Sequence, residues 1–216
     1  ATGSVNFLIL GFCMGVCNGF AIPLAHKFGA GDYRGLRAFM VNAIYLSAIF
    51  AVVMTAVTVV FCRPILELMR TPDNIIDGAY LYIVIIFAGI PATYLYNLIS
   101  AIIRSMGDSK TPVVFLVISS VMNIALDLVF IINLHLGVAG ASLATVISQA
   151  VSGIGCLIYS WKKFEILHPD AEERRWNSSY MKTLCGMGVP MGLQYSITAI
   201  GSVILQSAVN TLGSNA

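Results

Sequence analysis

Six long apolar runs occupy most of this chain of 216 residues. A helix needs about 20 predominantly apolar residues to cross the hydrocarbon core of a bilayer, and every run reaches that length. The composition agrees, because 58% of the residues are hydrophobic and only 10% are charged, whereas soluble domains carry about 25% charged residues. We therefore predict an all-α polytopic membrane protein with six transmembrane helices. The predicted spans are residues 4–23, 38–61, 80–103, 113–134, 138–161 and 187–212.

The charged residues between the runs predict how the helices are oriented. When successive loops are assigned alternately to two sides, ten Lys and Arg residues fall on one side and only Arg63 and Arg70 on the other. Cytoplasmic loops carry an excess of Lys and Arg, so the first side is predicted to be cytoplasmic. The net charge of +2 offers no basic face, and no nucleic-acid partner is expected. The ten residues are Lys27, Arg34, Arg37, Arg104, Lys110, Lys162, Lys163, Arg174, Arg175 and Lys182.

Residues 162–182 form a longer connection of mixed charge. We interpret this segment as a cytoplasmic linker between two helical bundles, because the other loops are short enough to hold antiparallel neighbours in one bundle. Pro91 and Pro190 each interrupt the backbone hydrogen bonds of a run and predict kinks. The chain opens with Ala1-Thr2-Gly3, without an initiator Met or a signal peptide. We therefore expect an excerpt of a longer protein.

Asp127 is the only ionisable side chain set deep inside any apolar run. A carboxylate near the middle of a spanning helix costs roughly 2.5–3.5 kcal/mol on insertion scales. Such a residue normally faces the interior of the helix bundle, where a proton or a metal ion neutralises it. Packing alone seldom justifies an acid in this position, so Asp127 is the first candidate for a functional residue.

Polar residues recur at helical spacing in the fourth and fifth runs. Asn123 lies one turn before Asp127, and Thr145 and Gln149 form a second stripe in the next run. If these stripes face each other, an amide oxygen, a carboxylate, a hydroxyl and a freed backbone carbonyl can converge. Such an all-oxygen nest suits a hard monovalent cation or a proton, and we place Gln149 in the polar network beside it.

Helix packing is the competing interpretation of the same polar residues. Small and hydroxylated side chains also allow close helix contact in membranes, so Thr145 and Gln149 taken alone favour packing or interhelical hydrogen bonding. For Asn123 the two interpretations balance. Tyr82 and Asn97 in the third run are likewise open to interfacial anchoring or interhelical bonding.

Three other classes of function are less well supported by the residues. The sequence has no glycine-rich Walker pattern, so an ATP-driven pump would need a separate subunit. An intramembrane hydrolase needs a nucleophile and a base within reach, and no His lies well inside a run. We therefore expect no enzymatic activity and no cofactor. A non-transporting membrane scaffold is an alternative, and Asp127 argues against it.

Five segments of the chain form a characteristic ordered set. The three longer ones are Ile103-Arg-Ser-Met-Gly-Asp-Ser-Lys-Thr-Pro112, Asn123-Ile-Ala-Leu-Asp127 and Gly137-Val-Ala-Gly-Ala-Ser-Leu-Ala-Thr-Val-Ile-Ser148. The two shorter ones are Lys27-Phe-Gly-Ala-Gly-Asp32 and Gly188-Val-Pro190. With this set the chain resembles the multidrug and toxic compound extrusion (MATE) family of cation-coupled efflux transporters.

The resemblance implies a particular domain organisation. Family members have twelve helices in two lobes of six, and this chain corresponds to the second helix through the seventh. Residues 1–161 would then be the amino-terminal lobe without its first helix, 162–182 the cytoplasmic linker between the lobes, and 183–216 the first helix of the carboxy-terminal lobe. An acidic residue on the first helix, which helps to form the cation site in prokaryotic members, would lie outside the chain.

The resemblance also implies roles for individual residues. It places Tyr82 and Asn97 near the polar network and drug cavity of the amino-terminal lobe. It places four residues on the cation site of that lobe, which in the family binds sodium: Asn123, Asp127, Thr145 and, through its backbone carbonyl, Ala141.

The functional expectation is a secondary antiporter. It would export amphipathic, often cationic organic compounds across the bacterial inner membrane in exchange for sodium or protons. Sodium is favoured, because Asn123 and Thr145 supply neutral oxygens that a proton would not require. The alternative within transporters is a lipid-linked oligosaccharide flippase of the same wider superfamily, which a cavity lined by basic residues would favour. The expected partners are a small organic substrate and the lipid bilayer, with the full-length protein a monomer.

Overall fold

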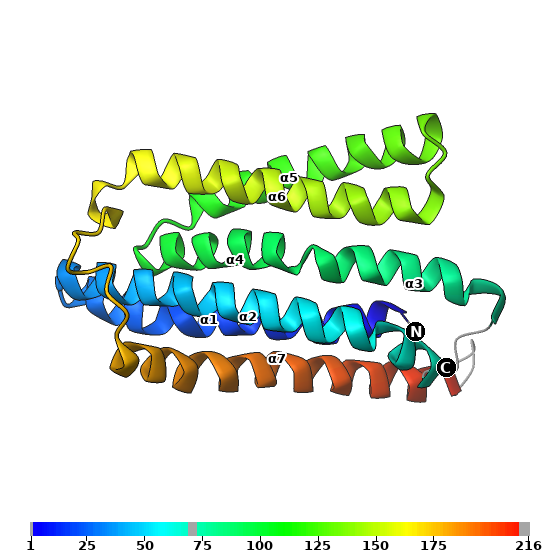
Figure 1. The fold of residues 1–216 in the computed structure, drawn as a ribbon, viewed down its shortest axis with the longest axis horizontal. Helices are drawn as coiled ribbons and strands as arrows, with labels where there is room; N and C mark the ends of the chain where they lie inside the picture. The colour runs from blue at the N-terminus through cyan, green and yellow to red at the C-terminus, as the bar shows by residue number, and fades with distance from the viewer. Residues whose placement is uncertain (1, 69–72, 212–216) are drawn as a thin grey trace.

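The computed structural model describes residues 2–68 and 73–211, and within these ranges all regular structure is helical. The helices lie side by side as long antiparallel rods (Figure 1), which confirms the predicted all-α class. A π-helical turn, η1, follows α5, and a 3-10 turn, η2, follows α6. In chain order the elements are α1 (Thr2–Gly29), α2 (Tyr33–Leu68), α3 (Asp73–Ala88), α4 (Ile90–Ser105), α5 (Lys110–Leu128), η1 (Val129–Asn133), α6 (Gly137–Lys163), η2 (Glu165–Leu167) and α7 (Ser178–Thr211).

The described residues contain up to five candidate membrane spans. The helices α1, α2, α5 and α6 are each long and apolar enough to span a membrane, and α3 with α4 makes a fifth span that bends by 44°. The bend lies at Gly89, directly before α4, and Pro91 stands in the first turn of that helix. Proline has no backbone N–H and fits the first turn of a helix, so α4 starts there in a new direction. The third predicted run is therefore one span made of two helices.

The sixth predicted run, residues 187–212, maps onto α7. This helix is 34 residues long, and Pro190 lies inside it without ending it. The side chains of residues 203 and 205–211 lie outside the described part of the chain, so the described residues do not test whether this helix spans the membrane. The described residues therefore account for up to five of the six expected spans, and the sixth stays a prediction. Residue 212 lies outside the described part of the chain.

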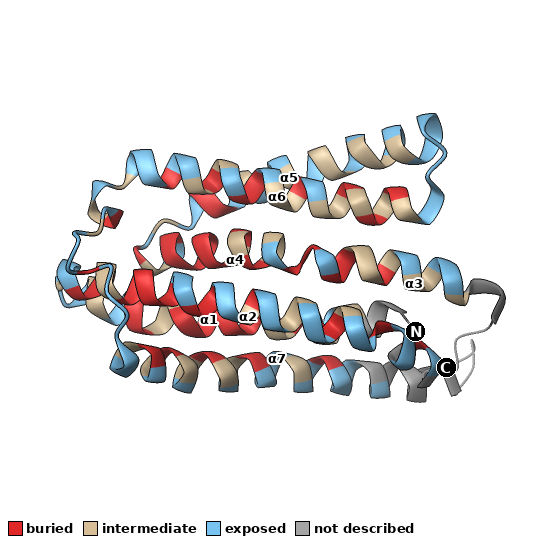
Figure 2. Cartoon of the chain, in the orientation of Figure 1, coloured by how far each residue is buried: buried red, intermediate tan, exposed pale blue. Residues whose placement is uncertain are grey.

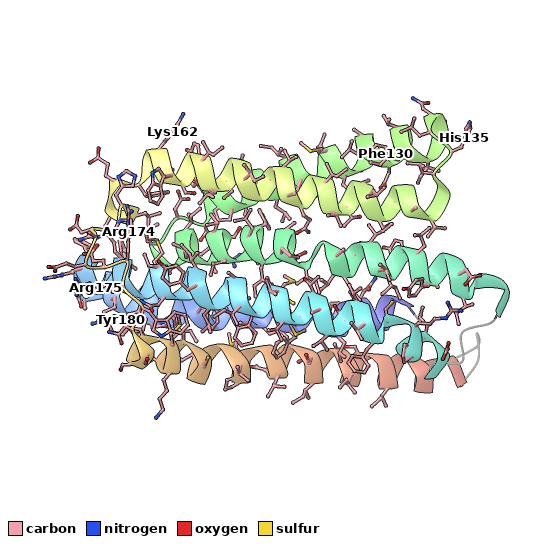
Figure 3. The ribbon with its side chains drawn as sticks, viewed as in Figure 1. Phe130, His135, Lys162, Arg174, Arg175 and Tyr180 are labelled. Carbon is pink, nitrogen blue, oxygen red and sulfur yellow. The ribbon has the colours of Figure 1, made fainter. Side chains whose placement is uncertain are left out.

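The connections that carry the predicted cytoplasmic charge gather at one end of the bundle. The α1–α2 turn, the α4–α5 turn and the α6–α7 connection all lie at the left end in Figure 1. In Figure 3, Lys162, Arg174 and Arg175 lie at this end, and His135 lies at the opposite end. Arg70 is outside the described residues. The alternating assignment of loops therefore agrees with the arrangement of the helices, and we refer to the left end as the cationic end.

The buried core lies among α1, α2, α3, α4 and α7, and α5 is peripheral (Figure 2). In α5 only Thr111 and Pro112, in its first turn, are buried. Its apolar side chains, Val117 and Val121 among them, are more than half exposed. An exposed apolar face of this kind suits contact with lipid tails. Large side chains that are fully buried in the core include Phe20, Leu24, Leu36, Phe87, Ile90 and Leu184.

A close crossing between α1 and α7 depends on glycine. A Cβ atom added at Gly15 would lie 2.7 Å from the Cα of Gly192, and one added at Gly19 would meet the backbone of Gly188 in the same way. Real Cβ atoms do not approach backbone that closely, so the two helices can touch here only because both sides lack side chains. Each helix carries its glycines four residues apart, the small-xxx-small spacing of tightly packed membrane helices.

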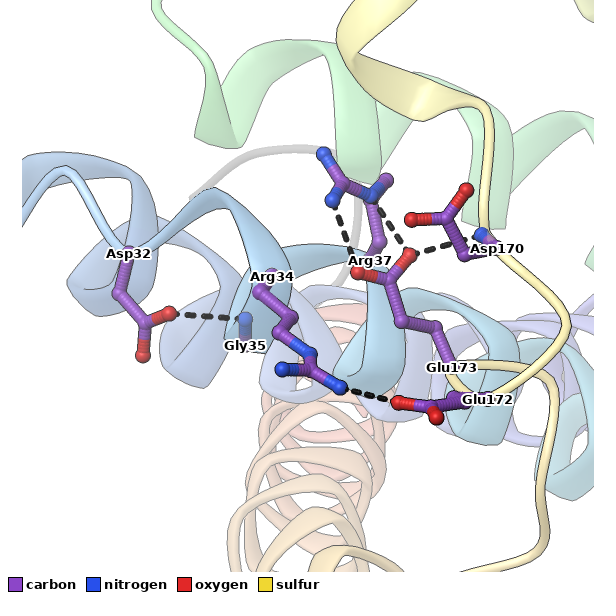
Figure 4. Close-up of polar contacts among 7 residues, drawn as sticks. All are labelled: Asp32, Arg34, Gly35, Arg37, Asp170, Glu172 and Glu173. Atoms are coloured by element: carbon purple, nitrogen blue, oxygen red, sulfur yellow. Dashed lines mark hydrogen bonds and ion pairs between the residues drawn. The ribbon is translucent and has the colours of Figure 1, made fainter.

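The connection between α6 and α7 is shorter than predicted, because residues 178–182 already belong to α7. It is also held by side chains of α2. The Oδ1 atom of Asn42 accepts a hydrogen bond from the backbone N–H of Asn177 at 2.9 Å. Arg34 pairs with Glu172, and Arg37 pairs with Glu173 (Figure 4). The segment 164–177 is therefore fastened to the start of α2.

Candidate functional site

The polar stripes of α5 and α6 meet, as the sequence predicts. The side-chain amide Nδ2 of Asn123 donates a hydrogen bond to the Thr145 hydroxyl oxygen at 3.3 Å. The Thr145 hydroxyl in turn donates to the backbone carbonyl of Ala141 at 3.0 Å. The structure thus connects three of the four residues expected on the cation site. This bond uses one of the two N–H groups of the Asn123 amide and does not involve its Oδ1 atom, which can accept from or coordinate another group.

Asp127 lies one helical turn beyond Asn123 and is half-buried. Its Oδ1 atom is buried and has no hydrogen-bond partner. A buried polar atom without a partner costs about 1–3 kcal/mol, and more when the group is charged. The arrangement therefore suits a proton or a small cation, which would satisfy this oxygen. Within the described part of the chain, no group of three or more His, Cys, Asp and Glu side chains gathers around a common point.

A π-helical turn follows Asp127 almost directly and was not predicted. In η1 the backbone N–H of Leu134 bonds to the carbonyl of Val129 at 3.1 Å, a spacing of five residues instead of four. His135 then adopts a positive φ of 52°, which is uncommon for a residue other than glycine. Turns of the π type often occur at functional sites within helices. No local sequence signal distinguishes such a turn from the end of an ordinary helix.

A small cavity of about 170 Å³ adjoins these residues and is formed by α1, α3, α4, α5 and α6. Thr145, Asn97 and Gln149 line it together, while Leu10 and Met14 supply part of its apolar wall. The Asn97 side-chain amide donates to the carbonyl of Thr93 at 2.8 Å. The Oε1 atom of Gln149 is buried without a hydrogen-bond partner. Thr145 is thus shared by the cavity and the hydrogen-bonded pair with Asn123.

Four predicted residues do not line this cavity, namely Asn123, Asp127, Ala141 and Tyr82. Asn123 reaches the cavity through its hydrogen bond to Thr145, which lines it. Asp127 lies on the same helix as Asn123, one turn further along. Tyr82, on α3, is half-buried and packs against the hydrophobic core. A role for Tyr82 in the polar network therefore stays a prediction. The cavity walls consist of apolar side chains interrupted by a few hydrogen-bonding groups, which is the composition of sites for small organic molecules.

Comparison with known proteins gives consistent matches. A family model, MatE, matches residues 1–129. The probable multidrug resistance protein YoeA of Bacillus subtilis is 31% identical over 97% of this chain and 47% of its own length. The multidrug export protein MepA of Staphylococcus haemolyticus is 25% identical over 89% of this chain and 43% of its own length. The chain therefore spans about half the length of the curated relatives that it matches.

Solved structures share the fold. An outward-facing multidrug resistance MATE family transporter of the MOP superfamily superposes with a TM-score of 0.89 at 24% identity, covering 98% of this chain and 47% of its own. An inward-facing one gives a TM-score of 0.82 at 25% identity, covering 91% of this chain and 45% of its own. The family model covers more than half of this chain, and the helical arrangement agrees with it. This multi-pass plasma-membrane protein belongs to the MATE family.

Proposed function

We propose that the full-length protein is a secondary antiporter that exports amphipathic, often cationic organic compounds in exchange for sodium or protons. The relatives are named as multidrug resistance and export proteins, which supports export over an enzymatic role. The observation that carries the proposal is the unpartnered Oδ1 atom of Asp127 beside the Asn123–Thr145 hydrogen bond. This arrangement is costly unless a cation or proton binds there.

Asp127 acts as the coupling acid in this proposal. When it is ionised, its buried Oδ1 atom has no hydrogen-bond partner, so a conformation that admits a compensating cation is stabilised. A ligand shifts an equilibrium between two conformations only by its difference in affinity for them. One charge that crosses ~100 mV releases about 2.3 kcal/mol, and a tenfold gradient of a neutral substrate costs about 1.4 kcal/mol. One coupling ion can therefore sustain a useful gradient.

Sodium is our first choice for the coupling ion. A proton needs only the carboxylate of Asp127, whereas a sodium ion also needs neutral oxygens around it. Asn123 Oδ1, the Thr145 hydroxyl and the Ala141 carbonyl belong to one hydrogen-bonded group and supply oxygens of this kind. The adjoining apolar cavity is the proposed contact surface for the substrate, with Asn97 and Gln149 as its polar groups.

Dye export from proteoliposomes tests the proposal. The full-length protein would be reconstituted with a fluorescent cationic dye, and export would be measured under a sodium gradient at fixed pH and under a pH gradient in sodium-free buffer. Asp127→Asn should abolish ion-driven export without reducing the amount of inserted protein, because an amide is cheaper than a carboxylate to bury in the membrane. The matched control is Asp77→Asn, which neutralises an exposed carboxylate on α3. Export at wild-type rates by Asp127→Asn would refute the assignment.

A lipid-linked oligosaccharide flippase is the second transport function considered. Recognition of a pyrophosphate-linked sugar favours basic residues in the cavity wall. In the described structure, the residues that line the cavity include no Lys or Arg. Drug export is therefore preferred. Ion-driven transport of a lipid-linked oligosaccharide by the same proteoliposomes, without transport of the dye, would reverse that preference.

A further inference from the structure

A larger cavity lies at the cationic end of the bundle, away from Asp127. Its volume is about 660 Å³, and it lies between the α4–α5 turn, the first turns of α5 and the last turns of α6. Ser109, Lys110 and Lys163 provide polar groups, and Val114, Phe115 and Tyr159 provide apolar surface. The cavity therefore combines cationic and apolar walls, and the proposed antiport does not use it.

The charges in this cavity leave one cation uncompensated. Lys163 Nζ lies 3.0 Å from Asp108 Oδ2. Asp108 also accepts the backbone N–H groups of Lys110 and Thr111 at 3.0 Å. These hydrogen bonds, first of all that from the Thr111 backbone, hold the pKa of Asp108 well below its usual range, so Asp108 is ionised and offsets Lys163. The ammonium group of Lys110 has no ion pair or hydrogen bond to any residue that the structure describes, and it leaves the wall with a net positive charge.

The apolar wall runs from the cationic residues toward the hydrocarbon region. Val114 is 55% exposed and follows Lys110 by one turn of α5, a helix with almost no buried residues. On α6, Tyr159 is 44% exposed, and Lys163 Nζ stands 5.3 Å from the centre of its ring. Aromatic side chains of this kind mark the level of the lipid headgroups. The cationic wall thus lies at headgroup level, with the apolar wall below it.

We propose that this cavity binds an anionic phospholipid of the cytoplasmic leaflet. The phosphate contacts Lys110 and Lys163 at the level of the headgroups, and an acyl chain lies along Val114 and Phe115. The excess of cationic residues at this end places it in the cytoplasm, where basic pockets between transmembrane helices bind anionic headgroups. Free inorganic phosphate has the same charge chemistry but gains nothing from the apolar wall, so the lipid is the assigned occupant. The inference depends on the membrane setting and not on the transported substrate.

Lipid titration of the purified full-length protein in detergent tests this site. The probes are phosphatidylglycerol, phosphatidylcholine and inorganic phosphate, and native mass spectrometry counts the bound lipid. Lys110→Gln should weaken phosphatidylglycerol binding about fivefold, since a Lys near a charged lipid surface contributes about 1 kcal/mol. The control is Lys162→Gln, which removes an exposed cation from the last turn of α6 that does not line the cavity, and it should bind as the wild type does. Phosphatidylcholine should bind more weakly, and millimolar phosphate should not displace phosphatidylglycerol.

Each contrary result would overturn the proposal in a different way. Unchanged phosphatidylglycerol binding in Lys110→Gln would remove the site. Equal weakening in Lys110→Gln and Lys162→Gln would show attraction to the whole charged surface and no defined pocket. Displacement by inorganic phosphate would assign the cavity to a free anion. Because Lys110 makes no side-chain bond in the described structure, its variant should fold normally, which an unchanged unfolding temperature checks.

Discussion

Arg37 holds Glu173 through two parallel hydrogen bonds, from Nε to Oε2 and from Nη2 to Oε1, both at 2.7 Å (Figure 4). Only 3% of the Glu173 side chain is exposed, and its Oε2 atom also accepts the backbone N–H of Asp170. The two partners are 136 residues apart in sequence. This ion pair fastens the α6–α7 connection to the start of α2 and so helps to set where α7 begins.

Replacing Glu173 by Gln should destabilise the protein by about 2 kcal/mol, the usual size of a hydrogen bond to a charged group with a buried partner left unpaired. Thermal unfolding of the full-length protein in detergent measures the change. Glu172→Gln is the matched control, because the pair of Glu172 with Arg34 is 71% exposed on both sides and should contribute little. Equal effects of the two substitutions would show that burial of Glu173 does not matter.

The same pair predicts a dependence of stability on pH. The Arg37 guanidinium lowers the pKa of Glu173 below its ordinary value of 4.5. A carboxylate whose pKa is depressed by folding stabilises the folded state at neutral pH, and this contribution disappears as the pH falls from about 5 through the folded pKa. Unfolding temperatures measured from pH 7 downward should therefore fall more steeply for the wild type than for Glu173→Gln. Parallel curves for the two proteins would contradict this account.

Substitutions at Asn123 and Thr145 should lower the affinity for the coupling ion without affecting insertion into the membrane. Asn123→Leu and Thr145→Val each remove an oxygen and should raise the half-maximal sodium concentration for export about tenfold, with Asn123→Leu the stronger. The two residues share a hydrogen bond, so the double variant should lose less than the product of the single losses. Thr198→Val is the control, since the exposed Thr198 hydroxyl donates to the Gln194 carbonyl of its own helix. Unchanged sodium curves in both single variants would mean that the stripe serves packing.

The close glycine contact between α1 and α7 predicts that alanine substitutions at different glycines of α1 will differ in how much they destabilise the protein. Gly15→Ala should destabilise the contact between α1 and α7 by about 1–3 kcal/mol, because the new methyl group meets the backbone of Gly192 and neither helix can yield without shifting. Gly11→Ala is the matched control, as its nearest neighbour would be the Tyr195 Cβ at an ordinary 3.9 Å. Unfolding temperatures compare the two variants. A smaller loss for Gly15→Ala than for Gly11→Ala would exclude the crossing as a tight contact.

The features that the sequence alone determined depend on the bilayer. The hydrocarbon core offers no water to the backbone N–H and C=O groups, and a helix satisfies these groups within a single segment. Long apolar runs therefore predict spanning helices directly. A buried carboxylate is costly wherever the neighbouring helices lie, so Asp127 could be singled out before any fold was known. Helical spacing likewise predicted that Asn123 and Thr145 could meet, and their hydrogen bond confirms that the two stripes face each other. Their ion-binding role stays a prediction.

Tertiary structure decided which surfaces meet. Glycines occur throughout the chain, and only the arrangement of the helices shows that Gly15 faces Gly192. From the sequence, Arg37 and Glu173 look like ordinary charged residues near loops. Only the folded structure shows that they form a buried ion pair. The π turn after Asp127 and the exact start of α7 were also missed. In each case the stabilising energy comes from contacts between distant segments, and local hydropathy and helix spacing carry no information about which distant segment will be the partner.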